Sequence, residues 1–327
     1  MLKGLKMKNK ELLFGIGLFI VFALIPVIGS KYTIYFSTQL LFTILFATSL
    51  NLLVGHAGLF SFGHVGFYAI GAYAFTILYK TYGVPFGVSF VAGPLLAAVA
   101  AVIFGYFCIR LTKIYFTFLT LAFAQIIWAI TFKWTPVTGG DSGIVGVTPP
   151  SFLIPLNNTY FLTLGVVAVL IYVMYRIAHS PFGLMLNVIR ENPNRAEFIG
   201  VNVRLYQLII FTISGFFAGF AGVLFVLLTR SIFPDVLLVT RSIDVVAMVI
   251  VGGMYNFWGP MIGAVVLLYL NSFVKVYTEY WLLVLGIILA VVVLFFPDGI
   301  SGIFPWISAR FKRLMARFKP RKGELSA

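Results

Sequence analysis

The sequence is short of acidic side chains and of cysteine. Only 10% of the 327 residues are charged, against about a quarter in soluble domains, and just nine are Asp or Glu. So few carboxylates leave little for acid–base catalysis, and no serine-protease triad, HExxH pair or Walker A loop is recognisable. The single cysteine, Cys108, excludes an intrachain disulfide and a cysteine-based metal cluster. We therefore expect no catalytic residue, no metal site and no cofactor in this chain.

Apolar residues dominate the rest of the chain. Hydrophobic residues make up 61% of it, in runs too continuous for the alternating strands of a membrane barrel. A helix needs about 20 such residues to cross about 30 Å of hydrocarbon. We predict an all-α, polytopic integral membrane protein with about ten transmembrane helices, eight or nine being the alternatives. The expected crossings are Leu12–Gly29, Ile34–Val54, Ser61–Tyr79, Val88–Ile109, Ile114–Phe132, Tyr160–Ile177, Leu208–Thr229, Asp244–Met254, Trp258–Val276 and Trp281–Pro297.

The last three crossings are short, and the first of them has two interpretations. Asp244–Met254 either crosses the membrane or is re-entrant, and we expect Asp244 itself to lie at the interface. Three crossings are favoured because they return the basic C-terminus to the side on which the chain began.

Positive charge is confined to a few segments. Of the 23 Lys and Arg residues, 17 lie at the N-terminus, in one short turn, around residues 178–207 and in the tail 310–327. Cytoplasmic loops carry the excess of Lys and Arg, so both termini and loop 178–207 should face the cytoplasm and loop 133–159 the outside of a cell (inner) membrane. Residues 1–309 then form the transmembrane domain, and the tail anchors to lipid headgroups. The charge does not indicate nucleic-acid binding.

Loop 178–207 is long, polar and rich in turn signals. Ser180-Pro181, Asn192-Pro193 and Gly200 punctuate it, and two helical pieces are predicted near Phe182–Glu191 and Arg195–Ile199. Plain connectors are usually shorter. The loop therefore predicts a compact helical hairpin that docks a partner, with a solvated connector as the alternative.

Two segments interrupt predicted helices with glycine. They are GHAGLFSFGHVGFYAIGAY (55–73) and GGMYNFWGPMIGA (252–264), and they form a weak internal repeat. Broken helices survive in membranes only where they line a cavity or are buried in protein, and paired broken spans indicate a translocation path. The alternative is close helix packing, with the histidines acting as structural hydrogen-bonding groups. The candidate path residues are Ser61, Gly63, His64, Asn256 and Gly259.

Several blocks resemble, in family order, the LivM-type permease subunit of branched-chain amino acid ABC importers. The resemblance implies a second related permease subunit, two ATP-binding cassette subunits that bind the ATP, and an extracytoplasmic substrate-binding protein. It also implies that this subunit is not an enzyme. The blocks are GLFSFGHVGFYAIGAYA (58–74), TGGDSGI (138–144), SPFGLMLNVIRENPNRAEFIGVNV (180–203), FTISGFFAGFAGVLF (211–225), GGMYNFWGPMIGAVVL (252–267) and LFFPDGISGIF (294–304).

The resemblance also gives loop 178–207 a role, because in this family a short helix of the loop seats in a groove of the ATPase. Ala196 and Gly200 match the Ala-x-x-x-Gly part of the importer signature, whereas Asn194 and Arg195 replace its Glu and first Ala. We expect the docking contact to involve Arg190, Glu191, Arg195, Ala196, Glu197 and Gly200.

The substrate has alternatives. The block TGGDSGI is more similar to the amino acid members of the family than to its urea members. A urea permease subunit is the nearest alternative, and a secondary transporter is an alternative of another class. A membrane enzyme is disfavoured by the lack of a catalytic cluster.

Overall fold

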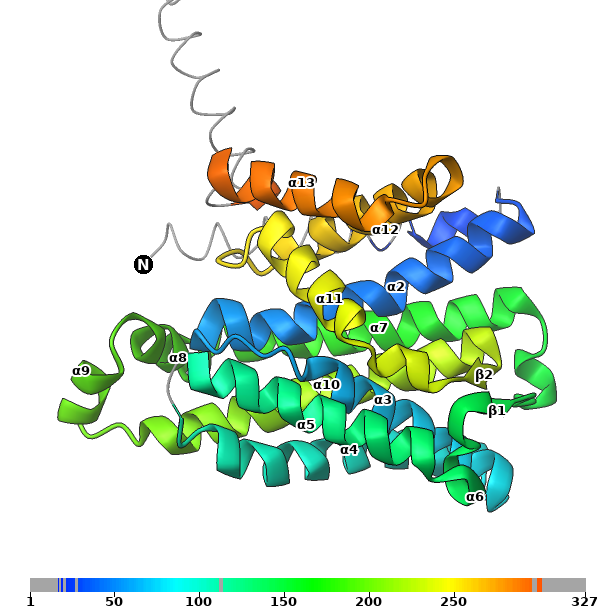
Figure 1. The fold of residues 1–327 in the computed structure, drawn as a ribbon, viewed down its shortest axis with the longest axis horizontal. Coiled ribbons are helices and arrows are strands. Elements are labelled where there is room, and N and C mark those ends of the chain that lie inside the picture. The colour runs from blue at the N-terminus through cyan, green and yellow to red at the C-terminus, as the bar shows by residue number, and fades with distance from the viewer. Residues whose placement is uncertain are drawn as a thin grey trace, which may run out of the picture.

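The computed structural model describes residues 17, 19, 22–26, 29–111, 114–295 and 299–301. Its long helices pack into one bundle, with α12 and α13 along one side (Figure 1). The long helices are α2 (Lys31–Asn51), α3 (His64–Thr76), α4 (Phe86–Cys108), α5 (Ile114–Lys133), α7 (Leu156–Ala178), α10 (Val203–Thr229), α11 (Val239–Gly252), α12 (Gly259–Tyr277) and α13 (Trp281–Phe295).

Short elements join these helices. Two π-helical turns extend α2 and α3, namely η1 (Leu52–Ala57) and η2 (Ile77–Thr81). The others are α6 (Thr135–Thr138), η3 (Gly140–Ser142), β1 (Ile144–Val145), η4 (Ser151–Leu153), α8 (Pro181–Glu191), α9 (Pro193–Phe198), β2 (Ser231–Ile232) and η5 (Pro234–Leu237).

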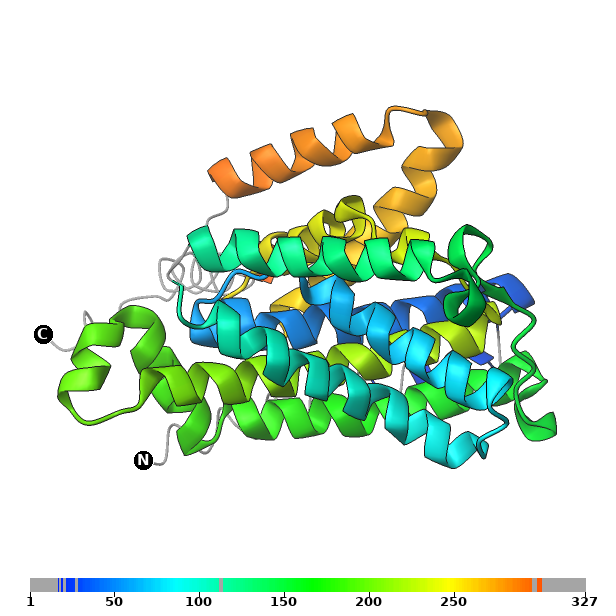
Figure 2. The same ribbon diagram turned by 60° about the horizontal axis from the view of Figure 1, so that its bottom comes forward.

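The bundle has two distinct ends. At one, which we call the strand end, β1 pairs antiparallel with β2, so that Ile144 lies opposite Ile232. The Tyr79 hydroxyl donates to the Thr148 carbonyl oxygen (3.0 Å) at the same end. The other, which we call the hairpin end, carries α8 and α9, and both views show the two helices projecting there (Figures 1 and 2).

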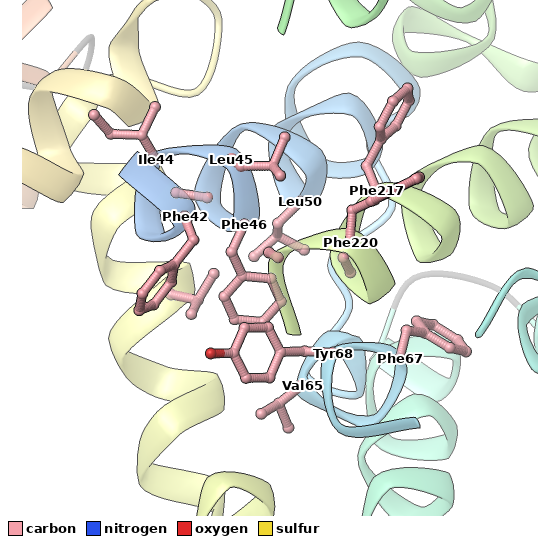
Figure 3. Close-up of a cluster of buried hydrophobic side chains, with 14 of the residues drawn as sticks. Phe42, Ile44, Leu45, Phe46, Leu50, Val65, Phe67, Tyr68, Phe217 and Phe220 are labelled. Atoms are coloured by element: carbon pink, nitrogen blue, oxygen red, sulfur yellow. The ribbon is translucent and has the colours of Figure 1, made fainter. Parts of the chain in front are cut away.

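Helix α10 is at the centre because its small residues admit neighbouring backbones. A Cβ on Gly219 would come within 2.9 Å of Pro94 in α4, and one on Gly222 would collide with the Tyr68 carbonyl of α3. Close approach of this kind is typical of membrane helices, which pack through small side chains. Side chains of α2, α3 and α10 fill the space between them, as Figure 3 shows for Phe46, Tyr68 and Phe220.

The helices fit a membrane protein by length and composition. Within the described residues, five are long and apolar enough to cross a bilayer: Lys31–Ala57, Phe86–Cys108, Ile114–Lys133, Leu156–Ala178 and Val203–Thr229. Helices α4 and α5 expose many large apolar side chains, as lipid or a protein partner would require.

The all-α prediction is therefore confirmed, and the count of ten crossings stays a prediction. Helices α3, α11, α12 and α13 fall short of the length or hydropathy of a full span in the described residues. Most of the predicted crossing Leu12–Gly29, the end of Trp281–Pro297, most of the block 294–304 and the basic tail 310–327 lie outside the described residues.

Some predicted boundaries differ from the observed ones. The predicted crossing Ser61–Tyr79 begins only at His64, because residues 58–63 form an irregular link after the π-helical turn. The predicted Asp244–Met254 is part of a longer helix, α11, which starts near β2 and ends where Met254 meets Gly55. Helix α11 has 14 residues and is not among the helices long enough to cross a bilayer, so the choice between a crossing and a re-entrant segment stays a prediction.

Candidate coupling and translocation site

The hairpin of α8 and α9 forms because local caps dictate it. The Ser180 hydroxyl accepts from the Gly183 N–H (3.3 Å), and the Asn192 side chain accepts from the Arg195 N–H (3.1 Å). A proline follows each cap at the first helical position, where a missing N–H costs nothing. The two predicted helical pieces of loop 178–207 are thus confirmed.

Gly200 ends α9 in the left-handed region, with φ of +85°. The Val201 N–H donates to the Ala196 carbonyl (3.1 Å), as in a Schellman C-cap. Ala196, one of the predicted docking residues, is fully buried and packs with Ile189 and Val203 in a small core of the hairpin itself. It therefore supports the hairpin from inside, and any partner must meet other side chains.

The tip of the hairpin presents two side chains that the sequence analysis did not select. Phe198 is 90% exposed and Ile199 is 69% exposed. Glu191, Arg195 and Glu197, which were selected, are exposed beside them. Two adjacent large apolar residues at a projecting tip, surrounded by charge, have the composition of an anchor for a partner pocket.

Arg190 points the other way, into the bundle. Its guanidinium donates to the Gly55 carbonyl oxygen and lies 5.1 Å from the ring centroid of Tyr255. Its side-chain stem covers Gly58, where a Cβ would come within 2.8 Å of the Arg190 Cγ. A charged donor and a cation–π contact are the stronger kinds of polar interaction available to one side chain. One residue of the hairpin therefore touches both glycine-broken segments.

The two broken segments meet at the hairpin end of the bundle. The Asn51 amide donates to the Asn256 carbonyl oxygen (3.3 Å), and a Cβ on Gly55 would collide with the Met254 carbonyl. Gly253 adopts φ of +106°, a conformation that an L side chain rarely takes. The structure thus brings together the two segments that the sequence paired as a weak repeat.

The predicted path residues fall into two places. Ser61, Gly63 and His64 are buried at the start of α3, where a Cβ on Gly63 would strike the backbone of Thr120. His64 Nε2 lies 2.8 Å from the Ser49 hydroxyl, and the imidazole stacks on Phe46. This is the structural role that the sequence analysis held as the alternative for the histidines.

The other two path residues lie on the second broken segment. Asn256 is exposed, and Gly259 is buried where its Cβ would come within 3.0 Å of the Gly253 carbonyl carbon. Among the described residues, the Ser61 hydroxyl and the Asn51 amide oxygen are buried and have no hydrogen-bond partner. Unpartnered buried atoms also occur at Thr48, Tyr73 and Thr163, so these two atoms do not single out a path.

The chain is similar to known proteins along most of its length. It matches the family described as the permease component of branched-chain amino acid transport systems over residues 32–293. It is 29% identical over 318 residues to the high-affinity branched-chain amino acid transport system permease protein LivM of Escherichia coli (strain K12), an alignment that covers 89% of this chain and 75% of the relative.

A second relative is more distant. The probable branched-chain amino acid transport permease protein LivH of Methanocaldococcus jannaschii is 28% identical over 196 residues, covering 54% of this chain and 60% of the relative. No solved structure matches the chain significantly.

Proposed function

Because the chain belongs to the family of permease components of branched-chain amino acid transport systems, we propose that it forms one half of the membrane pathway of an ABC importer. It acts with a second, related permease subunit, two ATP-binding cassette subunits and an extracytoplasmic substrate-binding protein. The substrates are branched-chain amino acids. The subunit itself is not catalytic, and its partners bind and hydrolyse ATP.

The observation that supports this function best is the bridge made by Arg190. The exposed apolar tip of the hairpin is suited to a groove on an ATPase, and Arg190 connects the same hairpin to Gly55 and Tyr255 in the bundle. A displacement of the docked hairpin therefore reaches both broken segments through one side chain. Residues 58–63 and 253–258 of these segments lack regular helix, so bending there breaks few helical hydrogen bonds.

The broken segments are suited to a polar path. Backbone groups that leave a helix in the membrane must be satisfied by protein, water or substrate. The N-terminus of α12 begins at Gly259 and that of α3 at His64, and helix N-termini favour a carboxylate. Ser61 and Asn256 stay our predicted lining residues, while Gly63, His64 and Gly259 determine how closely the surrounding backbones approach.

Orientation follows from charge. The hairpin end carries Arg176, Arg190, Arg195 and Arg204, and we place it in the cytoplasm together with both termini. The strand end, with loop 133–159, then faces the binding protein outside the inner membrane.

Reconstitution of the complete importer tests the function. Proteoliposomes that contain both permeases and the ATPases should accumulate labelled leucine only when ATP is inside and the loaded binding protein is outside. Labelled urea is the matched control, and its accumulation in place of leucine would identify the urea alternative. Uptake driven by an ion gradient without the ATPases would identify a secondary transporter and contradict the proposal.

A further inference from the structure

A cavity of about 210 Å³ lies between α2, α3, α10, α11 and α12, and Val65 and Tyr68 of the first broken segment line it. One water needs only about 10–15 Å³ of such space, so the cavity can hold a molecule of several heavy atoms. In Figure 3 the Tyr68 hydroxyl, which lines the cavity, points towards the yellow ribbon of α11. None of the residues selected from the sequence as a path residue lines it.

The polar lining residues of the cavity lie nearer the strand end, where Phe225 and Val236 also line it. On the side nearer the strand end it is lined by Gln39, Arg241, Asp244, Asn271 and Ser272. One or two helical turns nearer the hairpin end, the same helices present Phe46, Met248 and Leu268. The order follows from helix direction, because α2 and α11 run towards the hairpin end and α12 runs away from it.

Two opposite charges stand on the polar side. Arg241 and Asp244 are three residues apart on α11, so that both project from one face of the helix. Ionisable side chains at membrane depth are costly and mark ligand or ion sites. Asp244 is half-buried and Arg241 is exposed, and the expected position of Asp244 at the membrane interface stays a prediction.

The lining matches one class of ligand. A guanidinium recognises a carboxylate through paired hydrogen bonds, and a carboxylate accepts from an ammonium group. Gln39, Asn271 and Ser272 add neutral donors and acceptors. The apolar side accepts an aliphatic chain, as ligand pockets with few polar groups and apolar walls do. A purely anionic ligand would be repelled by Asp244, and a purely cationic ligand would be repelled by Arg241. Urea has no apolar part that could pack against Phe46.

We propose that this cavity is a binding station for a zwitterionic α-amino acid with an aliphatic side chain, held with its carboxylate at Arg241 and its ammonium at Asp244. The inference rests on the proposed function and adds a location and an orientation for the substrate. The main chain of the ligand faces the strand end, and its side chain points towards Phe46, Met248 and the hairpin end.

Two neutral variants of nearly the same shape test the station in the complete importer. Asp244→Asn and Arg241→Gln should each lower ATP-driven leucine uptake by at least about tenfold, the effect of losing one charged hydrogen-bond partner. Asp235→Asn, an exposed aspartate on η5 outside the cavity, is the matched control and should transport normally.

Thiol protection provides a readout that does not depend on transport by a variant with altered charge. In a Cys108→Ala background, Ser272→Cys places a thiol in the cavity wall, and Ser142→Cys places one at the exposed strand end. With the binding protein and ATP present in both samples, added leucine should slow modification by a small methanethiosulfonate reagent at position 272 several-fold and leave position 142 unchanged.

The outcomes separate the two proposals. If the unaltered importer does not take up leucine, the proposed function fails. If it does, but both neutral variants transport at the unaltered rate, the station is wrong. Absence of leucine protection at position 272 in an importer that transports leucine also overturns the station, and would mean that lipid or the second permease fills the cavity. Where a neutral variant fails to assemble, the protection experiment decides alone.

Discussion

Replacing Arg190 by Gln removes a side chain that connects the hairpin to both broken segments. Glutamine is shorter and neutral, so it loses the charged hydrogen bond to Gly55 and the contact with the Tyr255 ring. The caps at Ser180 and Asn192 are untouched, and the hairpin should still form and bind the ATPase. The expected result is ATP hydrolysis that moves little leucine.

The structure sets the size of this effect. A hydrogen bond from a charged donor contributes about 1.5–3 kcal/mol. A partly exposed cation–π contact adds about 0.5–1 kcal/mol. The bridge is then worth about 2–4 kcal/mol, and each 1.4 kcal/mol is a factor of ten in population. Neighbouring side chains relax and recover part of this, so leucine transported per ATP hydrolysed should fall by at least about tenfold.

The assay measures leucine uptake and phosphate release in the same proteoliposomes, together with co-purification of the ATPase. Arg204→Gln is the matched control, since Arg204 is an exposed arginine at the start of α10 in the same loop. An unchanged ratio of leucine to ATP in Arg190→Gln would refute the reasoning. Loss of the ATPase in step with loss of uptake would show that Arg190 docks the partner instead of joining the hairpin to the bundle.

Three further predictions concern the hairpin and its orientation. Gly200→Val should lower ATPase association in a pull-down, because a β-branched residue at φ of +85° costs about 1–2 kcal/mol. Gly200→Asn should associate normally, and equal behaviour of the two variants would contradict a strain effect. Phe198→Ala should weaken ATPase binding at least about tenfold, since burying a phenyl ring is worth about 1.5–3 kcal/mol, while Phe152→Ala, exposed at the strand end, should not change the affinity. In intact cells a membrane-impermeant thiol reagent should label Ser142→Cys but neither Asn194→Cys nor Lys319→Cys. Labelling at position 194 would reverse the orientation. Labelling at position 319, which lies outside the described residues, would refute ten crossings.

Local features of the hairpin were predictable because short-range physics determines them. A polar cap followed by proline favours a helix start, and a glycine after a short helix takes positive φ cheaply. The sequence therefore predicted both helical pieces and the turn at Gly200. The weak repeat also identified two segments that the structure brings into contact at Gly55 and Met254.

Side-chain direction was not predictable from the same information. Arg190 and Ala196 were grouped with Glu197 as docking residues, yet one points into the bundle and one is buried in the hairpin. A short helix has a solvent face only after its neighbours are placed, and α8 packs on the π-helical turn that ends α2, more than 120 residues earlier in the chain. The exposure of Phe198 could not be predicted for the same reason. An apolar residue near a helix end is expected in the core unless the positions of the neighbouring elements are known.

The cavity was beyond the sequence for a stronger reason. Its lining comes from five separate helices, and Gln39 and Asn271 lie at opposite ends of the described chain. Taken alone, each of these residues is a polar residue within an apolar run and does not indicate a binding site. Only the packing of α11 against α2 and α3 brings the charges of Arg241 and Asp244 to a common space with the Tyr68 hydroxyl.

Helix α11 connects the proposed binding station to the segment that Arg190 contacts. Helix α11 carries Arg241 and Asp244 at its start and leads, through Gly253, to the segment that Arg190 holds. Its 14 residues span about 21 Å, and a helix of that length moves as a rigid rod. A Cβ on Gly263 of α12 would collide with the Met248 carbonyl of α11, so the backbones of α11 and α12 are too close to slide independently. If the docked hairpin pulls on Tyr255, we expect α11 and α12 to tilt together and to shift both of their walls of the cavity relative to α2 and α3.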